Sequence, residues 1–301
     1  MPKAPSLRGQ VVLITGAGSG IGAATAHELQ RRGAIPVLVD CDPDTLAATA
    51  AGIGDGALAI AADVTDRADC ERAVARALAR HGRIDVAWAN AGVASFGPVA
   101  YTDPAAWLRC IEVNVIGVFN TVRAALPEVT RRRGYVAVTA SVASFAHPPA
   151  LSAYAASKAA AEAMCNAWRI ELAAHGVGVG AIHASWVRTP LMSEGDLHPA
   201  FRRLRSTTPP PLNGEMDAAA AARIIADGIA RRADRIWVPG WVRVLHWLRA
   251  LLHTRLAERE LRRAAPEIER LFLDAQDAGD PLASSIGPRE RARAAARERD
   301  A

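Results

Sequence analysis

Short apolar runs alternate with longer amphipathic stretches over residues 1–240 of this 301-residue chain. The apolar runs, which we expect to form strands, cover residues 11–14, 37–39, 57–62, 84–89, 135–139, 177–182 and 235–238. Helical periodicity covers residues 23–32, 43–51, 67–80, 104–130, 153–174 and 217–231, and a Pro-rich irregular segment covers 188–213. Apolar strands that alternate with helices form parallel sheets covered on both faces. The sequence therefore predicts an α/β fold in a domain of residues 1–240, a Rossmann-type doubly wound parallel sheet of about seven strands.

Residues 241–301 do not continue this alternation, and we expect them to form a helical C-terminal extension. Apolar residues from Trp241 to Leu256 recur at three- and four-residue spacing, which predicts an amphipathic helix. A second helix is expected over 266–275, and the charged segment 289–301 is a further helical candidate. Three roles stay open for the extension: a lid, a subunit interface, or a membrane-surface contact through residues 241–263, where arginines accompany tryptophan and leucine.

Composition narrows the function classes. The 36 basic and 31 acidic residues give a net charge of +5, and the short basic runs are spread over predicted helix ends, so nucleic-acid binding is not expected. The four cysteines are widely separated, which predicts neither a disulfide framework nor a metal site. The N-terminus lacks the apolar core of a signal peptide, and no apolar run of about 18 residues predicts a spanning helix. We therefore expect a cytoplasmic protein.

A glycine-rich turn, Thr15–Gly22, connects the first predicted strand to the first predicted helix. Such a turn brings backbone N–H groups and the positive end of a helix dipole to a pyrophosphate. Asp40 directly follows the second strand, where a carboxylate accepts hydrogen bonds from ribose hydroxyls and repels the 2′-phosphate of NADP. Neither Ser19 nor Cys41 offers that phosphate a cation. The sequence thus favours NAD(H) over NADP(H).

Tyr154 and Lys158 are four residues apart on a predicted helix, so they project from one face. Free tyrosine, with a pKa near 10, is a poor base at neutral pH, and a neighbouring ammonium group lowers that pKa. Only two of the 36 basic residues are lysines, Lys3 and Lys158, which makes the position of Lys158 informative.

In the order of its motifs, the chain resembles the short-chain dehydrogenase/reductase family over roughly residues 8–240. The resemblance rests on the glycine loop, Asp63-Val64, Asn90-Ala91-Gly92, Asn114, Ser141 and the Tyr154-x-x-x-Lys158 pair. It implies a catalytic group of Asn114, Ser141, Tyr154 and Lys158. It also implies cofactor contacts from Gly16, Ser19, Gly20, Ile21, Gly22, Asp40, Cys41, Asp63, Val64, Asn90, Ala91, Gly92, Tyr154, Lys158, Val187 and Thr189.

The resemblance implies an NAD-dependent oxidoreductase in which Tyr154 exchanges a proton with the substrate oxygen. Ser141 then donates a hydrogen bond to that oxygen, and Lys158 lowers the pKa of Tyr154 and binds the nicotinamide ribose. Asn114 is expected to hold a water that links Lys158 to solvent. One departure is clear: Ala184-Ser185 stands where the family usually has a Pro-Gly pair.

The family places its substrate pocket over Ser141 and Tyr154. Its expected lining is mainly apolar, which favours a lipophilic secondary alcohol or ketone, and comprises Ser95, Phe96, Val142, Phe145, Pro148, Trp186, Leu191 and Met192. The family commonly forms dimers or tetramers through its two long helices, here 104–130 and 153–174, so we expect a homo-oligomer. The alternative function is a catalytically silent dinucleotide-binding regulator or scaffold.

Overall fold

The computed structural model describes residues 6–54, 57–209, 212–278 and 285–286. Its main sheet has the strand order β3-β2-β1-β4-β6-β7-β8, and every neighbouring pair is parallel. The strands are β1 (Val11–Thr15), β2 (Ile35–Asp40), β3 (Leu58–Ala61), β4 (Val86–Ala89), β6 (Tyr135–Thr139), β7 (Gly178–Ala184) and β8 (Arg235–Val238). This order confirms the predicted doubly wound sheet.

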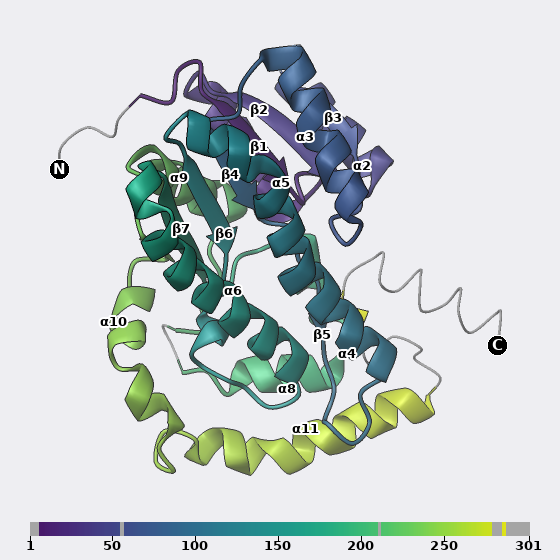
Figure 1. The fold of residues 1–301 in the computed structure, drawn as a ribbon. Coiled ribbons are helices and arrows are strands. Elements are labelled where there is room, and N and C mark those ends of the chain that lie inside the picture. Colours follow the sequence, from purple (N-terminus) through teal and green to yellow (C-terminus); the bar gives the residue numbers. More distant parts are fainter. Residues whose placement is uncertain (1–5, 55–56, 210–211, 279–284, 287–301) are drawn as a thin grey trace.

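Helices cover both faces of the sheet and enclose two apolar cores (Figure 1). One core joins the sheet to α3 (Arg67–His81), α5 (Gly117–Arg131) and α6 (Ser152–Glu171). The other joins it to α1 (Gly20–Arg31), α2 (Pro43–Ile53) and α9 (Ala218–Ala230). Burial on both sides explains why the strands are almost purely apolar in sequence.

Aspartate side chains begin several of these helices. Asp42 accepts hydrogen bonds from the backbone N–H groups of Asp44 and Thr45 at the start of α2, and Asp66 and Asp217 cap α3 and α9 in the same way. Because Asp42 caps α2, the carboxylate of Asp40 is not needed as the helix cap and stays at the end of β2.

The helix predicted over 104–130 is interrupted. It consists of α4 (Pro104–Ile111), a π-helical turn η1 (Glu112–Ile116), and α5. A π-helical turn inserts an extra residue into the helix and is frequent at functional sites. Here it contains Asn114, which is fully buried.

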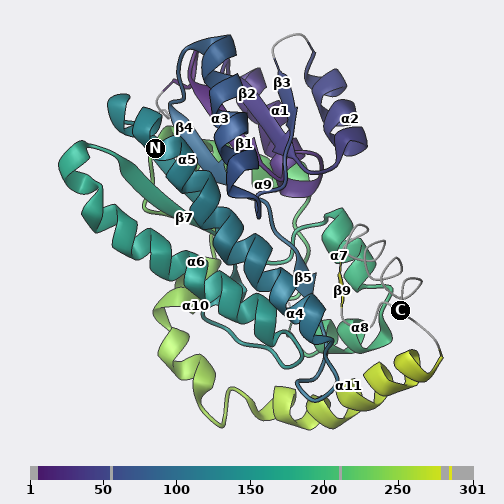
Figure 2. The same ribbon diagram turned by 45° about the vertical axis from the view of Figure 1, so that its right-hand side comes forward.

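The C-terminal extension differs from the prediction of one helix through Leu256. The chain forms α10 (Val242–Trp247), a 3-10 segment η4 (Arg249–His253) and then α11 (Arg259–Asp277), so that the predicted second helix begins before Pro266. Figures 1 and 2 show α10 passing α6 and α11 running below α8 (Pro199–Ser206) and α4. The break lets α11 bury its apolar face against α8, a tertiary contact that helical periodicity alone does not predict.

The loops at this end of the sheet also contain structure. The segment after β7 forms α7 (Pro190–Gly195) and α8, in agreement with the short helical pieces expected there. An unpredicted two-stranded antiparallel sheet pairs β5 (Ala94–Ser95) with β9 (Ser285–Ile286), next to the cluster that α11 joins. The helix considered for 289–301 lies outside the described residues. Across the parts of the chain described here, no helix is both long and apolar enough to cross a membrane.

Candidate active site

The predicted site residues follow neighbouring parallel strands at one edge of the sheet. The glycine loop follows β1, Asp40 ends β2, Asn90 follows β4, and Ser141 follows β6. The strand order reverses between β1 and β4, and ligands of such sheets bind at the carboxyl ends of strands beside this reversal.

The glycine loop is packed too closely for side chains. Gly16 has a positive φ of 66°, and a Cβ atom there would lie 2.7 Å from the Cα of Ala91. A Cβ atom at Gly22 would collide with the carbonyl oxygen of Gly16. These positions admit only glycine, so the turn keeps its backbone N–H groups accessible at the start of α1.

Asn90 ties this loop to the centre of the sheet. Its Nδ2 group donates to the carbonyl oxygens of Thr15 and Gly16 at 3.0 and 3.1 Å. Its Oδ1 atom accepts a 3.0 Å hydrogen bond from Thr139 on β6. Asn90 therefore positions the turn.

Asp40 lies directly beside the loop. One carboxylate oxygen accepts a hydrogen bond from Gly18 N–H at 2.9 Å, and the other accepts from Asp42 N–H at 3.0 Å. An aspartate held at the end of β2, together with the close-packed turn, fits the ribose and pyrophosphate of a dinucleotide.

Asp63, just after the third strand, is held by other side chains of the protein. Its carboxylate accepts hydrogen bonds from Thr65 and from Arg109, at 2.8–3.1 Å. Burial raises the pKa of Asp63, but the Thr65 hydrogen bonds and the Arg109 charge outweigh it and lower the pKa to about 2. The carboxylate thus anchors α4, and the neighbouring Val64 carbonyl accepts a hydrogen bond from Asn120.

Tyr154, Lys158 and Ser141 form one group. Lys158 Nζ lies 5.6 Å from the centroid of the Tyr154 ring and donates to the carbonyl oxygen of Thr139 at 2.8 Å. Ser141 donates to the carbonyl oxygen of Ala184 at 3.3 Å and also hydrogen-bonds the Tyr154 hydroxyl. The group joins the glycine loop through Thr139 and Asn90.

Lys158 was expected to lower the pKa of Tyr154, but in the structure burial dominates the pKa values of both residues. Burial raises the pKa of Tyr154 to about 12, although the hydrogen bond with Ser141 acts in the opposite direction. Burial also lowers the pKa of Lys158 to about 8. The ammonium group lies over the ring, and burial is the largest influence on the pKa of each group.

The Asn114 side chain makes hydrogen bonds to Val93 and Ser157. Its Nδ2 group donates to the Val93 carbonyl and to Ser157 Oγ, both at 2.9 Å, and its Oδ1 atom accepts from Val93 N–H at 2.9 Å. Ser157 in turn donates to the carbonyl oxygen of Tyr154. Asn114 therefore links the loop after β4 to the helix that carries Tyr154 and Lys158.

Ala184 and Ser185, which replace the usual Pro-Gly pair, lie at the end of β7. The strand continues to Ala184, and Ser185 N–H donates to the Val238 carbonyl on β8 at 2.8 Å. Beyond it, Val187 pairs with Met216, and Thr189 caps α7. The Thr189 methyl group lies 3.3 Å from where a Cβ of Gly20 would be, so this segment reaches the glycine loop.

The expected substrate pocket is only partly assembled as predicted. Tyr154, Trp186, Leu191 and Met192 pack against one apolar cluster that includes Phe96. Ser95 is also buried, and its hydroxyl has no hydrogen-bond partner among the described residues.

Phe145, which was expected to line this pocket, packs elsewhere in the structure. Its ring packs against His183 and His246, 5.2 Å from the His246 ring, at the junction with α10. The 3-10 turn Val142–Ser144 ends at Phe145, beyond Ser141. Pro148 lines a separate hollow of about 290 Å³ between the 97–99 loop and α11, and neither Ser141 nor Tyr154 lines that hollow.

The extension contributes residues that the sequence did not identify. Ala264, Ile268 and Phe272 of α11 are buried in the same cluster as Phe96, together with Phe201 and Leu204 of α8. They share one face at four-residue spacing, which is the only sequence signal that could have found them.

Comparisons with known proteins agree with this geometry. Residues 10–198 match the family model described as short chain dehydrogenase. The chain is 35% identical over 225 residues to oxidoreductase UcpA of Salmonella typhimurium, covering 73% of this chain and 84% of that protein. It is 32% identical to (-)-trans-carveol dehydrogenase of Rhodococcus erythropolis, covering 65% and 77% of the two chains.

A solved structure supports the same assignment. The chain resembles a 3-ketoacyl-(acyl-carrier-protein) reductase of Brucella melitensis, complexed with NADH, with a TM-score of 0.70 and 30% identity. The match covers 77% of this chain and 97% of the reductase. From its strand order, its glycine loop and these matches together, the chain belongs to the short-chain dehydrogenase family and is an oxidoreductase with a nicotinamide cofactor.

Proposed function

We propose that this protein transfers a hydride between NAD(H) and a lipophilic secondary alcohol or its ketone, with Tyr154 as general acid and base. One observation carries the proposal. The Tyr154 hydroxyl, hydrogen-bonded to Ser141 and backed by Lys158, is joined through Thr139 and Asn90 to a turn shaped for a dinucleotide.

The chemistry divides among these residues. The bound nicotinamide accepts or donates the hydride. In oxidation, the Tyr154 phenolate takes the substrate's hydroxyl proton, and in reduction the Tyr154 hydroxyl protonates the carbonyl oxygen. Ser141 donates a hydrogen bond to that oxygen as charge develops on it. Lys158 contributes positive charge beside the ring, and Asn114 positions the Tyr154 helix.

Preference for NAD(H) is part of the proposal. Asp40 is fixed at the end of β2 by Gly18 and Asp42, where its negative charge opposes a 2′-phosphate. The following residue, Cys41, is exposed and carries no positive charge. Ser19, at the N-terminus of α1, likewise offers no cation.

A lipophilic substrate is supported by the apolar cluster beside Tyr154. Trp186, Leu191 and Met192 adjoin this cluster, and α11 supplies Ile268 and Phe272 to it. We propose that α11 completes the pocket as a fixed cover. The relative named (-)-trans-carveol dehydrogenase, whose substrate is a small apolar secondary alcohol by its name, is consistent with this class.

A homo-oligomer, a dimer or tetramer, is also proposed. The paired long helices expose large apolar side chains, which marks an interaction surface. On α4, the π-helical turn and α5 these are Trp107, Leu108, Ile116 and Phe119, and on α6 it is Ile170. Light scattering of the purified protein tests this, and a monomer at all concentrations would contradict it.

The extension presents a second exposed apolar surface. Between residues 241 and 263, Trp247 is 73% exposed and Leu256 80% exposed, and Arg243 lies over the Trp247 ring at 5.4 Å. A peripheral contact with an anionic membrane is therefore a second candidate property. Co-sedimentation with anionic vesicles tests it, and a protein that never pellets with them would exclude it. The cysteine thiols, which form no disulfide within the described residues, are consistent with a cytoplasmic location.

The test of the main proposal is Tyr154→Phe, which keeps the ring and removes the hydroxyl. NADH formation from a panel of lipophilic secondary alcohols should fall to background, while NAD⁺ binding measured by calorimetry should remain near that of the unsubstituted protein. Turnover that survives in this variant would contradict the role of Tyr154. If the unsubstituted protein neither forms nor consumes NADH with any alcohol or ketone, the silent dinucleotide-binding alternative is favoured.

A further inference from the structure

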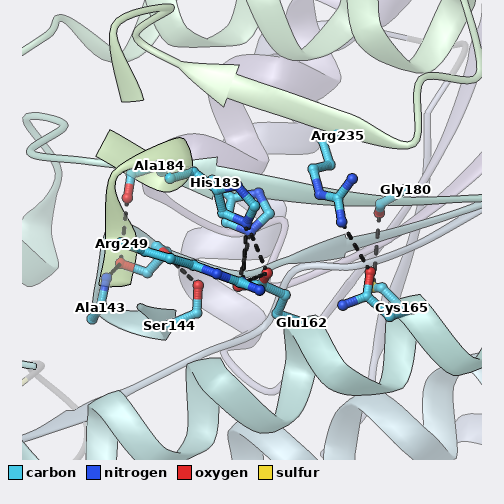
Figure 3. A network of polar contacts seen from close by, with 12 residues as sticks. Ala143, Ser144, Glu162, Cys165, Gly180, His183, Ala184, Arg235 and Arg249 are labelled. Carbon is cyan, nitrogen blue, oxygen red and sulfur yellow. Dashed lines mark hydrogen bonds and ion pairs between the residues drawn. The ribbon is translucent and has the colours of Figure 1, made fainter. Parts of the chain in front are cut away.

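Figure 3 shows Glu162 and His183 pointing toward one another, and with His246 they form a group of three side chains from distant parts of the sequence. They are Glu162 on α6, His183 on β7 and His246 on α10, and their ligand atoms all lie within 4.8 Å of one another. The Glu162 carboxylate lies 3.2 Å from Nε2 of His183 and 3.1 Å from Nε2 of His246. Sequence spacing predicted no metal site, because only the fold brings these residues together.

His183 is the most informative of the three. It is fully buried, and its Nδ1 atom has no hydrogen-bond partner among the residues that the structure describes. Its Nε2 atom faces the Glu162 carboxylate at 3.2 Å. A neutral imidazole presents one nitrogen with a lone pair, and Nε2 is therefore placed to bind a cation together with that carboxylate.

The spacing of the cluster suits a small tetrahedral ion. Bonds of about 2.0–2.2 Å from zinc to nitrogen and oxygen place neighbouring ligand atoms about 3.3–3.5 Å apart. The two carboxylate–imidazole distances, 3.1 and 3.2 Å, are close to this value. Two histidines and one glutamate form a ligand set that zinc uses in proteins.

Aromatic side chains surround the two histidines of this cluster. The Trp237 ring lies 4.7 Å from the His183 ring, and the Phe145 ring lies 5.2 Å from the His246 ring. The His246 side chain is 11% exposed, so a cation can enter from the side of α10.

Arg249 competes for the same carboxylate. Its guanidinium nitrogen lies 3.4 Å from both Glu162 and Nε2 of His246, and its side chain is 54% exposed. A long, exposed side chain of this kind can turn into solvent at little cost, which would leave the carboxylate to the metal.

We propose that Glu162, His183 and His246 form a zinc site that fastens the C-terminal extension to the catalytic domain. The ion would join α10 directly to α6 and β7, with Arg249 displaced when it binds. The proposal does not depend on the substrate or on the cofactor.

The test uses the full-length protein after treatment with a chelator. Zinc titration by calorimetry should give one site, and Co²⁺ in its place should give the visible bands of a four-coordinate ion. His246→Ala removes one of three ligands and should weaken binding at this site at least about a hundredfold. His246 lies at the edge of the fold, so its replacement should leave the catalytic domain folded. Glu162→Gln is a second ligand variant, but it changes a buried residue of α6.

Two matched controls separate a metal site from a simple ion-pair network. His253→Ala removes an exposed histidine that stacks on His147 at 4.8 Å, and zinc binding should be unchanged. Arg249→Ala removes the competing cation, and zinc binding should become tighter. If the unsubstituted protein binds no more zinc than His246→Ala, or if Arg249→Ala weakens binding as much as His246→Ala does, the zinc site is refuted.

Discussion

Replacing Phe272 by alanine should release α11 from the apolar cluster that contains Phe96. Phe272 is fully buried, and its ring lies 6.2 Å from that of Phe96 and 5.6 Å from that of His198. Phe→Ala substitutions in cores cost about 3–5 kcal/mol. At about 1.4 kcal/mol for each factor of ten, the population of molecules with α11 detached should rise by about two to three and a half orders of magnitude.

This cost should fall on α11 rather than on the whole domain. The cluster around Phe272 is separate from the two cores that hold the sheet, so α11 can open locally. Hydrogen exchange over residues 259–277 should therefore accelerate by that factor, while exchange in the sheet changes little. If α11 completes the pocket, KM for a lipophilic alcohol should rise as well.

The control for this experiment is Arg270→Ala on the same helix. Arg270 is exposed and pairs with Asp274 at 2.9 Å, a surface ion pair worth less than about 1 kcal/mol. It should leave both exchange and KM nearly unchanged. Unaltered exchange over 259–277 in Phe272→Ala would refute the anchoring role of Phe272, and accelerated exchange with an unchanged KM would refute the role of α11 as a pocket wall.

Three further predictions follow from the site. Asp40→Ala should reduce the preference for NAD⁺ over NADP⁺, measured as the ratio of kcat/KM for the two cofactors, because it removes the negative charge at the end of β2. Because burial raises the pKa of Tyr154 to about 12, oxidation, which needs the phenolate, should accelerate as the pH rises through the alkaline range, whereas ketone reduction, which needs the protonated hydroxyl, should change little until the pH approaches 12. Ionised Asp63, with its pKa lowered from 3.8 to about 2, stabilises the fold above about pH 4, and this contribution is lost as the pH falls toward 2. Arg109→Gln should raise that pKa, so urea midpoints should be lower than those of the unsubstituted protein at neutral pH and should converge with them in acid; a constant difference would contradict this.

The local pattern of the chain determined the parallel sheet and its cover of helices on both faces. Apolar runs between helices can only be buried in a sheet covered on both faces, and the carboxyl ends of its strands then meet at one edge. This geometry places the glycine loop and Asp40 together, and the family resemblance adds Asn90, Ser141 and the helix of Tyr154 and Lys158 to the same site. Each of these motifs depends on residues close together in sequence and on the strand that precedes them.

Only the tertiary structure decided what depends on contacts between distant segments. Arg109 and Thr65 take up the carboxylate of Asp63, and Phe145 packs at the α10 junction instead of in the pocket. The apolar spacing of residues 241–256 predicted one helix, but packing of α11 against α8 and contacts of Glu162 with α10 break it. Such contacts form between residues far apart along the chain, where periodicity and spacing carry no information about which faces will meet.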